Sequence, residues 1–218
     1  MKKAKACFFV ACVTLGSLFA QDQWGSVKNE TILQLSGIPG GCSGEKARLI
    51  MDLVKEHNFQ ICVEVGACAA RSLFPLVKAL HYNKSGKVYV TDALNLVNAI
   101  NGFSLPDHKQ ILEAYCTVLK KSPQEAAGQF DDASIDFIHF DGNQNEACAY
   151  QDVISYFPKI KDGGWILLDN PNWLSMKRAL VYLLERADIK SSFEPRADYL
   201  LLCKNARRTK NAYALMDN

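Results

Sequence analysis

The chain has 218 residues, 49% of them hydrophobic and 22% charged, with a formal net charge of +2 at pH 7. A chain of this length and ordinary composition is expected to form one globular domain with a sizeable core, without internal repeats or low-complexity linkers. The near-neutral charge argues against a nucleic-acid partner. The basic cluster at residues 204–210 does not change this, since it lies in a polar tail of a kind that is usually solvated.

Residues 1–20 have the pattern of a secretory signal. Lysines at positions 2, 3 and 5 precede an apolar run over residues 7–19, and Ala20 closes it with a small side chain. The run is shorter than the ~20 residues that cross a bilayer core, so no stable membrane span is expected once the signal is removed. We therefore expect export, to a periplasm or to the outside, if the signal is cleaved, and a cytoplasmic protein otherwise.

The cysteines outside this segment are irregularly spaced, and none forms a CxxC or a Cys/His pair with metal-site spacing. Cys62, Cys116 and Cys203 fall inside apolar runs, where a free cysteine behaves as a small buried hydrophobe. We expect mostly reduced, structural cysteines, although exported proteins more often use cysteines in disulfides.

A polar lead over residues 21–38 precedes the first predicted element. Ser43 is a good N-cap for a helix whose apolar face is residues 47, 50, 51 and 54, and we expect Lys46 and Arg48 to face outward. This helix is expected to pack beside the first strand.

The first strand is predicted over residues 60–65, followed by a small-residue loop and a helix through Phe74, Val77 and Leu80. Unpaired N–H groups at such a helix start suit an anionic group. The next strand, residues 86–92, ends in an acid placed to bind ribose hydroxyls. Because the loop lacks GxGxxG and Glu64 would repel a diphosphate, a zwitterionic nucleoside fits better than a nicotinamide dinucleotide.

Residues 135–170 are predicted to form a βαβ unit. Apolar runs over 135–142 and 165–168 read as buried strands, and residues 146–156 carry apolar side chains at helical spacing. Parallel strands with a right-handed crossover end on one rim of the sheet. Asp141, Asp169 and Asn170 are therefore expected to lie close together.

These motifs, in this order, resemble class I S-adenosylmethionine-dependent methyltransferases, and more narrowly the small bacterial methyltransferase-24-like enzymes. The matching pieces are Glu64-Val65-Gly66, Ser72, Asp92, residues 122–127, the 135–170 block, residues 42–47 and Trp173. The similarity covers residues 39 to about 184. It implies a Rossmann-like α/β fold with a doubly wound, mostly parallel seven-stranded sheet, residues 199–203 forming an antiparallel strand near the C-terminus. The methyltransferase domain would span residues 39–204, with a polar basic tail over 205–218.

The resemblance also implies the cofactor, S-adenosylmethionine, and the residues that hold it. The residue matching Glu64 holds the methionine ammonium, and the loop at Gly66 with Ser72 receives the carboxylate. The matches to Asp92, Ser122 and Asp141 lie at the ribose, at the adenine and under the transferred methyl, respectively. Asp141 and Gln144 are the predicted catalytic residues.

Three positions depart from the family pattern. Ala70 replaces a second glycine and is tolerable if its φ is negative, and Leu94 replaces a tryptophan. Gln144 replaces a histidine and can hydrogen-bond a substrate, but it cannot act as a base near neutral pH.

Asp141, Asp169 and Asn170 also correspond to the divalent-ion ligands of catechol-type O-methyltransferases, and such oxygen ligands suit Mg²⁺. A bound cation would lower the pKa of an acceptor hydroxyl, which Gln144 cannot do. The alternative to a metal site is that Asp169 and Asn170 only form a turn before Pro171. Separately, His139 is expected to be a core histidine whose polar atoms are satisfied.

Two functions remain open from the sequence. The first is methyl transfer to an oxygen of a small-molecule acceptor. The second is an exported, catalytically silent domain that uses the same fold for binding, since S-adenosylmethionine is made in the cytosol.

Overall fold

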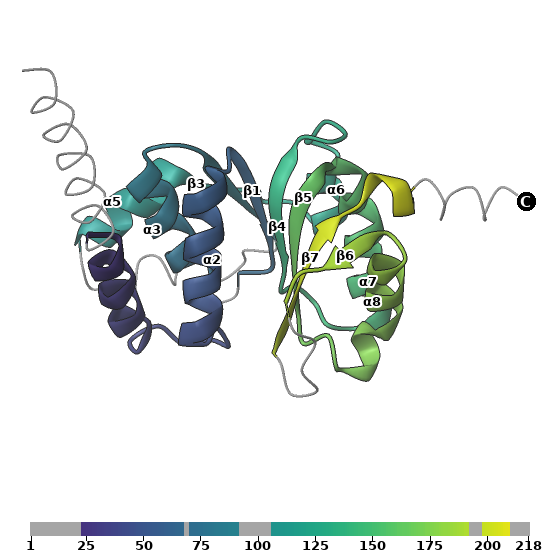
Figure 1. Cartoon of the computed structure of the whole chain (residues 1–218), viewed down its shortest axis with the longest axis horizontal. Coiled ribbons are helices and arrows are strands. Elements are labelled where there is room, and N and C mark those ends of the chain that lie inside the picture. The colour runs from purple at the N-terminus through teal and green to yellow at the C-terminus, as the bar shows by residue number, and fades with distance from the viewer. Residues whose placement is uncertain (1–22, 68–69, 92–105, 192–197, 210–218) are drawn as a thin grey trace, which may run out of the picture.

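The computed structural model describes residues 23–67, 70–91, 106–191 and 198–209. Within them a seven-stranded sheet has the order β3-β2-β1-β4-β5-β7-β6, with helices on both faces (Figure 1). The predicted signal over residues 1–20 lies outside this part of the chain, as do Asp92 and Leu94. Among the described residues no helix is both long enough and apolar enough to cross a membrane.

The predicted fold class is confirmed by the sheet. Neighbours from β3 to β5 pair in parallel, while β7 pairs antiparallel with both β5 and β6. The strands are β1 (Ile61–Val65), β2 (Lys87–Thr91), β3 (Cys116–Val118), β4 (Ile135–Phe140), β5 (Ile160–Asp169), β6 (Ala187–Ile189) and β7 (Tyr199–Lys204).

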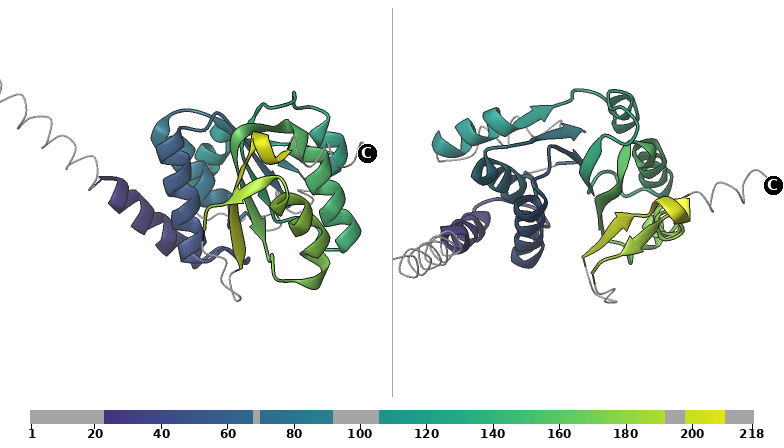
Figure 2. Two further views of the ribbon diagram at one scale, coloured as in Figure 1. Left: turned by 45° about the vertical axis from the view of Figure 1, so that its right-hand side comes forward. Right: turned by 45° about the horizontal axis from the view of Figure 1, so that its top comes forward.

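The helices form two layers with the sheet between them (Figure 2). One layer holds α2 (Gly44–His57), α3 (Leu73–Asn83) and α5 (Pro106–Tyr115), and the other holds α6 (Pro123–Ala127), α7 (Glu146–Tyr156) and α8 (Lys177–Leu184). Two short 3-10 helices, η1 (Phe157–Lys159) and η2 (Leu174–Met176), follow α7 and β5. Each layer buries its own apolar cluster against the sheet, around Ile50 and Leu76 on one face and Val153 and Leu183 on the other.

The polar lead contains a helix that the sequence analysis did not assign. Residues 23–35 are helical, and the face carrying Trp24, Thr31 and Leu35 is buried. Trp24 Nε1 donates to Asp52 Oδ1 on α2 at 2.8 Å. Because these three residues are spaced by about two and one helical turns, they share one face, and this face packs against the domain.

Helix α2 begins where its capping residue predicts, since the Ser43 hydroxyl accepts from Lys46 N at 3.1 Å. Its apolar face is buried as expected, and Arg48 is exposed. The expectation that Lys46 faces outward is wrong, because its side chain is only 1% exposed. Lys46 lies four residues before Ile50, which places both on the face that packs inward.

The described start of the predicted tail, residues 205–209, packs against the domain. Residues 206–209 form a helical turn, and the Arg208 guanidinium donates to Leu184 O at 2.9 Å. Lys204 is buried within β7. The described cysteines Cys42, Cys62, Cys116, Cys148 and Cys203 are free thiols.

The strand order sets the position of the site. β2 and β4 pair on opposite edges of β1, and the helices that follow β1 and β4, α3 and α7, cover opposite faces. The segments that follow β1 and β4 therefore run to opposite faces of the sheet from the C-terminal ends of these strands. This switch point is where doubly wound sheets bind ligands.

Candidate functional site

Charged side chains from three neighbouring strands meet at this rim. Glu64 on β1 is paired with His139 on β4, which is paired with Leu167 on β5. Since side chains alternate along a strand, Asp141 and Asp169 lie on the same face of the sheet as His139. Single polar atoms of His139, Asp141 and Asp169 all lie within 4.8 Å of one another.

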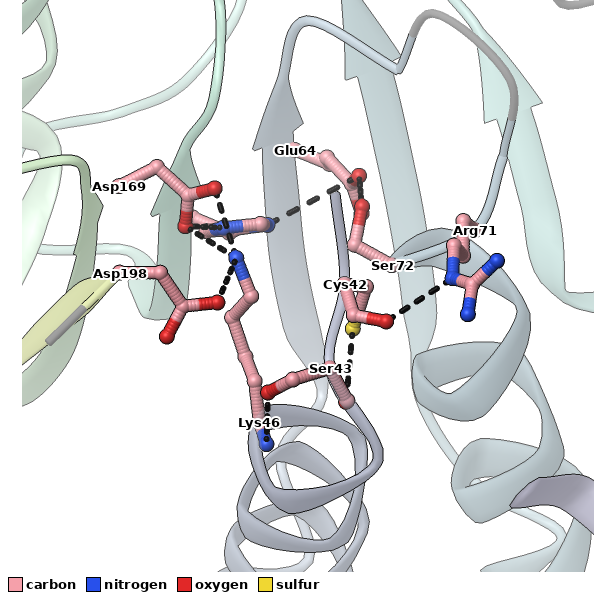
Figure 3. A network of polar contacts seen from close by, with 9 residues as sticks. Cys42, Ser43, Lys46, Glu64, Arg71, Ser72, Asp169 and Asp198 are labelled. Carbon is pink, nitrogen blue, oxygen red and sulfur yellow. Dashed lines mark hydrogen bonds and ion pairs between the residues drawn. The ribbon is translucent and has the colours of Figure 1, made fainter. Parts of the chain in front are cut away.

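The carboxylate of Asp169 is the centre of the cluster (Figure 3). Lys46 Nζ, reaching over from α2, donates to Asp169 Oδ1 at 2.9 Å and to Oδ2 at 2.7 Å. His139 Nε2 lies 2.8 Å from Oδ1. The ion pair is buried, with side chains 1% and 5% exposed, and it links residues 123 positions apart.

Glu64 forms the other end of the network. The Ser72 hydroxyl donates to Glu64 Oε1 at 2.5 Å, and His139 Nδ1 lies 3.8 Å from the same oxygen, an electrostatic contact and not a hydrogen bond. The resemblance assigns Glu64 to the cofactor ammonium and Ser72 to the cofactor carboxylate, and here these two side chains are hydrogen-bonded to each other. His139 Nδ1 is buried without a hydrogen-bond partner, so the prediction of a satisfied core histidine describes only one of its nitrogens.

The charges shift one another's pKa values. Burial lowers the pKa of His139, but the charge of Asp169, the hydrogen bond to it and the nearby Glu64 raise it to about 10. Burial opposes ionisation of Lys46 and Asp169 as well, yet their mutual attraction raises the pKa of Lys46 and, with His139, lowers that of Asp169.

Asp141 behaves differently from Asp169. Burial raises the pKa of Asp141 to about 7, and the negative charges of Asp169 and Glu64 add to the effect against the opposing charges of His139 and Lys46. Asp141 is therefore poised to exchange a proton near neutral pH.

Gly66 is required by the packing of two loops. It has φ +82°, and a Cβ there would lie 2.5 Å from Asp141 O and 2.7 Å from Gly142 N. The backbones are joined by a hydrogen bond from Asp141 N to Val65 O at 2.9 Å. A side chain at position 66 would push the predicted cofactor loop away from Asp141.

The loop after β1 is strained at Ala70, whose φ is +62°. The condition of a negative φ is therefore not met, and this alanine adopts a left-handed conformation that favours the glycine expected here from the resemblance. Arg71 holds the loop in place, because its guanidinium donates to Cys42 O at 2.9 Å and also to Ile38 O.

Ser122 and Gln144 lie apart from the charged cluster. Ser122 is exposed and caps α6 in a capping box with Glu125. Gln144 borders a hollow beside α7, where the other lining side chains include Phe140, Asp152, Val153, Leu168 and Met176. Trp173 and Leu174, just after β5, are 56% and 81% exposed.

The predicted metal ligands fit a divalent ion poorly. Both oxygens of Asp169 accept from the Lys46 ammonium, so a cation already lies at this carboxylate. Asn170 has a left-handed backbone, φ +48°, and its N–H donates to Asp198 O at 2.8 Å. Mg²⁺ binding at these residues stays a prediction.

Sequence reasoning missed Lys46 and the pairing of His139. A lysine on a predicted helix is usually read as solvated, but position 46 has the same spacing to Ile50 and Leu53 as the members of the buried face. His139 stands two residues before Asp141 on a strand, which puts both on one face. The helical spacing of position 46 and the strand alternation of position 139 were the sequence signals that indicated burial of Lys46 and a shared face for His139 and Asp141.

The strand order, with helices on both faces of the sheet, is that of the class I methyltransferase fold. Residues 63–170, just under half of the chain, match the family model described as a methyltransferase domain. No curated protein matches the chain.

Solved structures with the same fold include three methyltransferases. An SAH-bound methyltransferase from Podospora anserina has a TM-score of 0.60 at 12% identity, covering 82% of this chain and 87% of its own. An O-methyltransferase from Bacillus cereus in complex with SAH has 0.58 at 14%, covering 83% and 90%. The O-methyltransferase TomG from Streptomyces achromogenes, involved in tomaymycin synthesis and in complex with SAM, has 0.58 at 13%, covering 82% and 89%.

Proposed function

We propose that this chain is an S-adenosylmethionine-dependent methyltransferase that methylates an oxygen of a small-molecule acceptor. The observation that carries the proposal is the meeting of Glu64, the Gly66 loop and Asp141 at the switch point, within the segment that matches a methyltransferase domain. The solved neighbours support the cofactor, because those described above were determined with SAM or SAH.

The rim residues suit a cationic nucleoside. The cofactor supplies an electrophilic methyl on a sulfonium and carries an ammonium, and the carboxylates of Glu64 and Asp141 are the side chains that would attract these charges. Gly66 leaves the backbone of the loop free to approach the ligand, and Ser72 orients Glu64 through its hydrogen bond.

Methyl transfer needs an acceptor oxygen in line with the methyl and the removal of its proton. Asp141, with a pKa near 7, is the described side chain best suited to take that proton, since Gln144 cannot. The exposed Trp173 and Leu174 beside the rim favour an acceptor with an apolar part.

Calorimetry with SAM and SAH tests the proposal. We expect one site per chain, lost in Gly66→Ala because the new Cβ displaces the loop against Asp141. Gly163→Ala is a matched control, since Gly163 has φ +80° but nothing within 4 Å of its Cβ position. Folded protein without binding to either nucleoside would contradict the proposal, and binding without transfer to any diol or phenol would favour the silent domain.

We also propose, from the sequence alone, that residues 1–20 direct export. A fusion of this segment to a reporter that is active only outside the cytoplasm should be active. An inactive fusion, with the intact N-terminus on the purified protein, would place the chain in the cytoplasm.

A further inference from the structure

The Lys46 ammonium contacts both carboxylate oxygens of Asp169, as a cation bound to both oxygens of a carboxylate does. Its nitrogen lies 2.9 and 2.7 Å from the two carboxylate oxygens, and 3.7 Å from a carboxylate oxygen of Asp198. In Figure 3 the side chain rises from the start of α2 to a point between Asp169 and Asp198. Thus one ammonium faces two acids where a metal was predicted.

The acceptor capacity of Asp169 is mostly used. Oδ1 takes both Lys46 and His139 Nε2, and Oδ2 takes Lys46, whereas a carboxylate offers about four lone-pair positions. A magnesium ion binds carboxylate oxygen at about 2.1 Å, which would put it within about 5 Å of the Lys46 nitrogen. In a buried site two like charges at that distance repel strongly.

We propose that the Lys46 ammonium stands in place of the divalent cation, so that this rim is built to work without a metal. The inference deepens the proposed function, on which its catalytic meaning rests, but its test requires no methyl transfer. Lys46 is then a positioning residue: it fixes Asp169, neutralises its charge, and leaves Asp141 as the carboxylate available to ligands.

The chain contains a matched pair elsewhere. Lys28 Nζ contacts both oxygens of Asp52, at 2.7 and 2.9 Å, but those side chains are 19% and 37% exposed and lie between the 23–35 helix and α2. Lys28→Met therefore removes the same kind of ion pair without touching the rim.

The experiment is a titration of the full chain with Mn²⁺, in which the EPR signal of the free ion measures how much Mn²⁺ remains unbound. We expect no stoichiometric site in the wild type, in Lys46→Arg or in Lys28→Met. Lys46→Met should create one Mn²⁺ site, whose affinity is about 10–100-fold above that of the residual Mn²⁺ binding of the wild type. The reason is that the carboxylates remain while the competing Lys46 ammonium is gone. Adding Asp169→Asn to Lys46→Met should abolish that site.

A stoichiometric Mn²⁺ site in the wild type that Asp169→Asn removes would overturn the proposal, and so would a folded Lys46→Met that gains no site. If Lys46→Met does not fold, the wild type and Asp169→Asn decide the question on their own. SAH calorimetry on the same samples separates this outcome from the proposed function, because SAH binding can fail while the Mn²⁺ result stands.

Discussion

The two ends of the sheet hold their charged side chains in different ways. At the N-terminal ends of β1 and β4, the partly buried Asp136 accepts from the backbone N–H groups of residues 60 and 61, each at 2.9 Å, and from Lys161 Nζ at 2.5 Å. Lys204, on the antiparallel β7, donates to the carbonyls of Phe157 and Ile160 at 3.2 and 2.7 Å. At the C-terminal rim, Lys46, His139 and Asp169 are held mainly by each other.

This difference decides which charges are independent. A charge held by fixed peptide groups keeps its environment when a distant residue changes. A charge held by another ionisable side chain loses its partner, and its pKa and energy change with it. The rim is therefore the part of the molecule in which substitutions should be coupled.

The largest expected effect is at the rim. Lys46→Met should lower the free energy of unfolding by about 3–5 kcal/mol, because it leaves the Asp169 charge buried without its main partner. Adding Asp169→Asn should recover part of that loss. Urea unfolding of both single variants and the double variant checks this, and simple additivity would contradict the coupling.

At the opposite end, Lys204→Met should cost only about 1–2 kcal/mol, the cost of leaving two buried carbonyls without a donor. Part of this loss is offset because burial already lowers the pKa of Lys204 and so disfavours its charge. The same urea series should show this loss adding to that of Lys46→Met.

The pH dependence of stability should come from the rim as well. The pKa of His139 rises from 6.5 to about 10 on folding, so folding takes up a proton between these values. The resulting stability is fully present below pH 6.5 and is lost as pH rises toward 10, at about 1 kcal/mol per pH unit. Unfolding at pH 7, 8 and 9 should show this slope in the wild type and in Asp136→Asn, but not in His139→Gln.

The smallest effect is expected at Ala70. Ala70→Gly removes the strain of a left-handed alanine but adds freedom to the unfolded chain, so a gain of about 0.5 kcal/mol is expected. Thermal unfolding should show a small rise in Tm. A fall would mean that the strain is compensated by packing of the alanine methyl.

Much of the fold could be predicted because it depends on local periodicity. Helix α7 begins and ends where the apolar spacing of residues 146–156 predicts, and Ser43 caps α2 as its side chain suggests. The antiparallel β7 follows from the family resemblance and is confirmed. For α7 and the start of α2 the signal lies within about a dozen neighbouring residues, whereas the direction of β7 came from the resemblance alone.

The candidate site could be predicted only in part, because its contacts join distant residues. Strand ends indicated that Asp141 and Asp169 share a rim, and they do. Nothing local shows that Lys46 is paired with an acid 123 positions away, and charge alone suggested the opposite. The 23–35 helix was missed for a similar reason, since its few buried residues are spread over three turns.

The strand order has a consequence for how the chain is made. β1 ends at Val65, but its partner β4 begins at Ile135, so one side of β1 has no strand to pair with while residues 66–134 are synthesised. At ribosomal rates that wait is about 3–14 s. During this time the future binding rim does not exist, and the nascent chain exposes an apolar strand edge that a chaperone could bind.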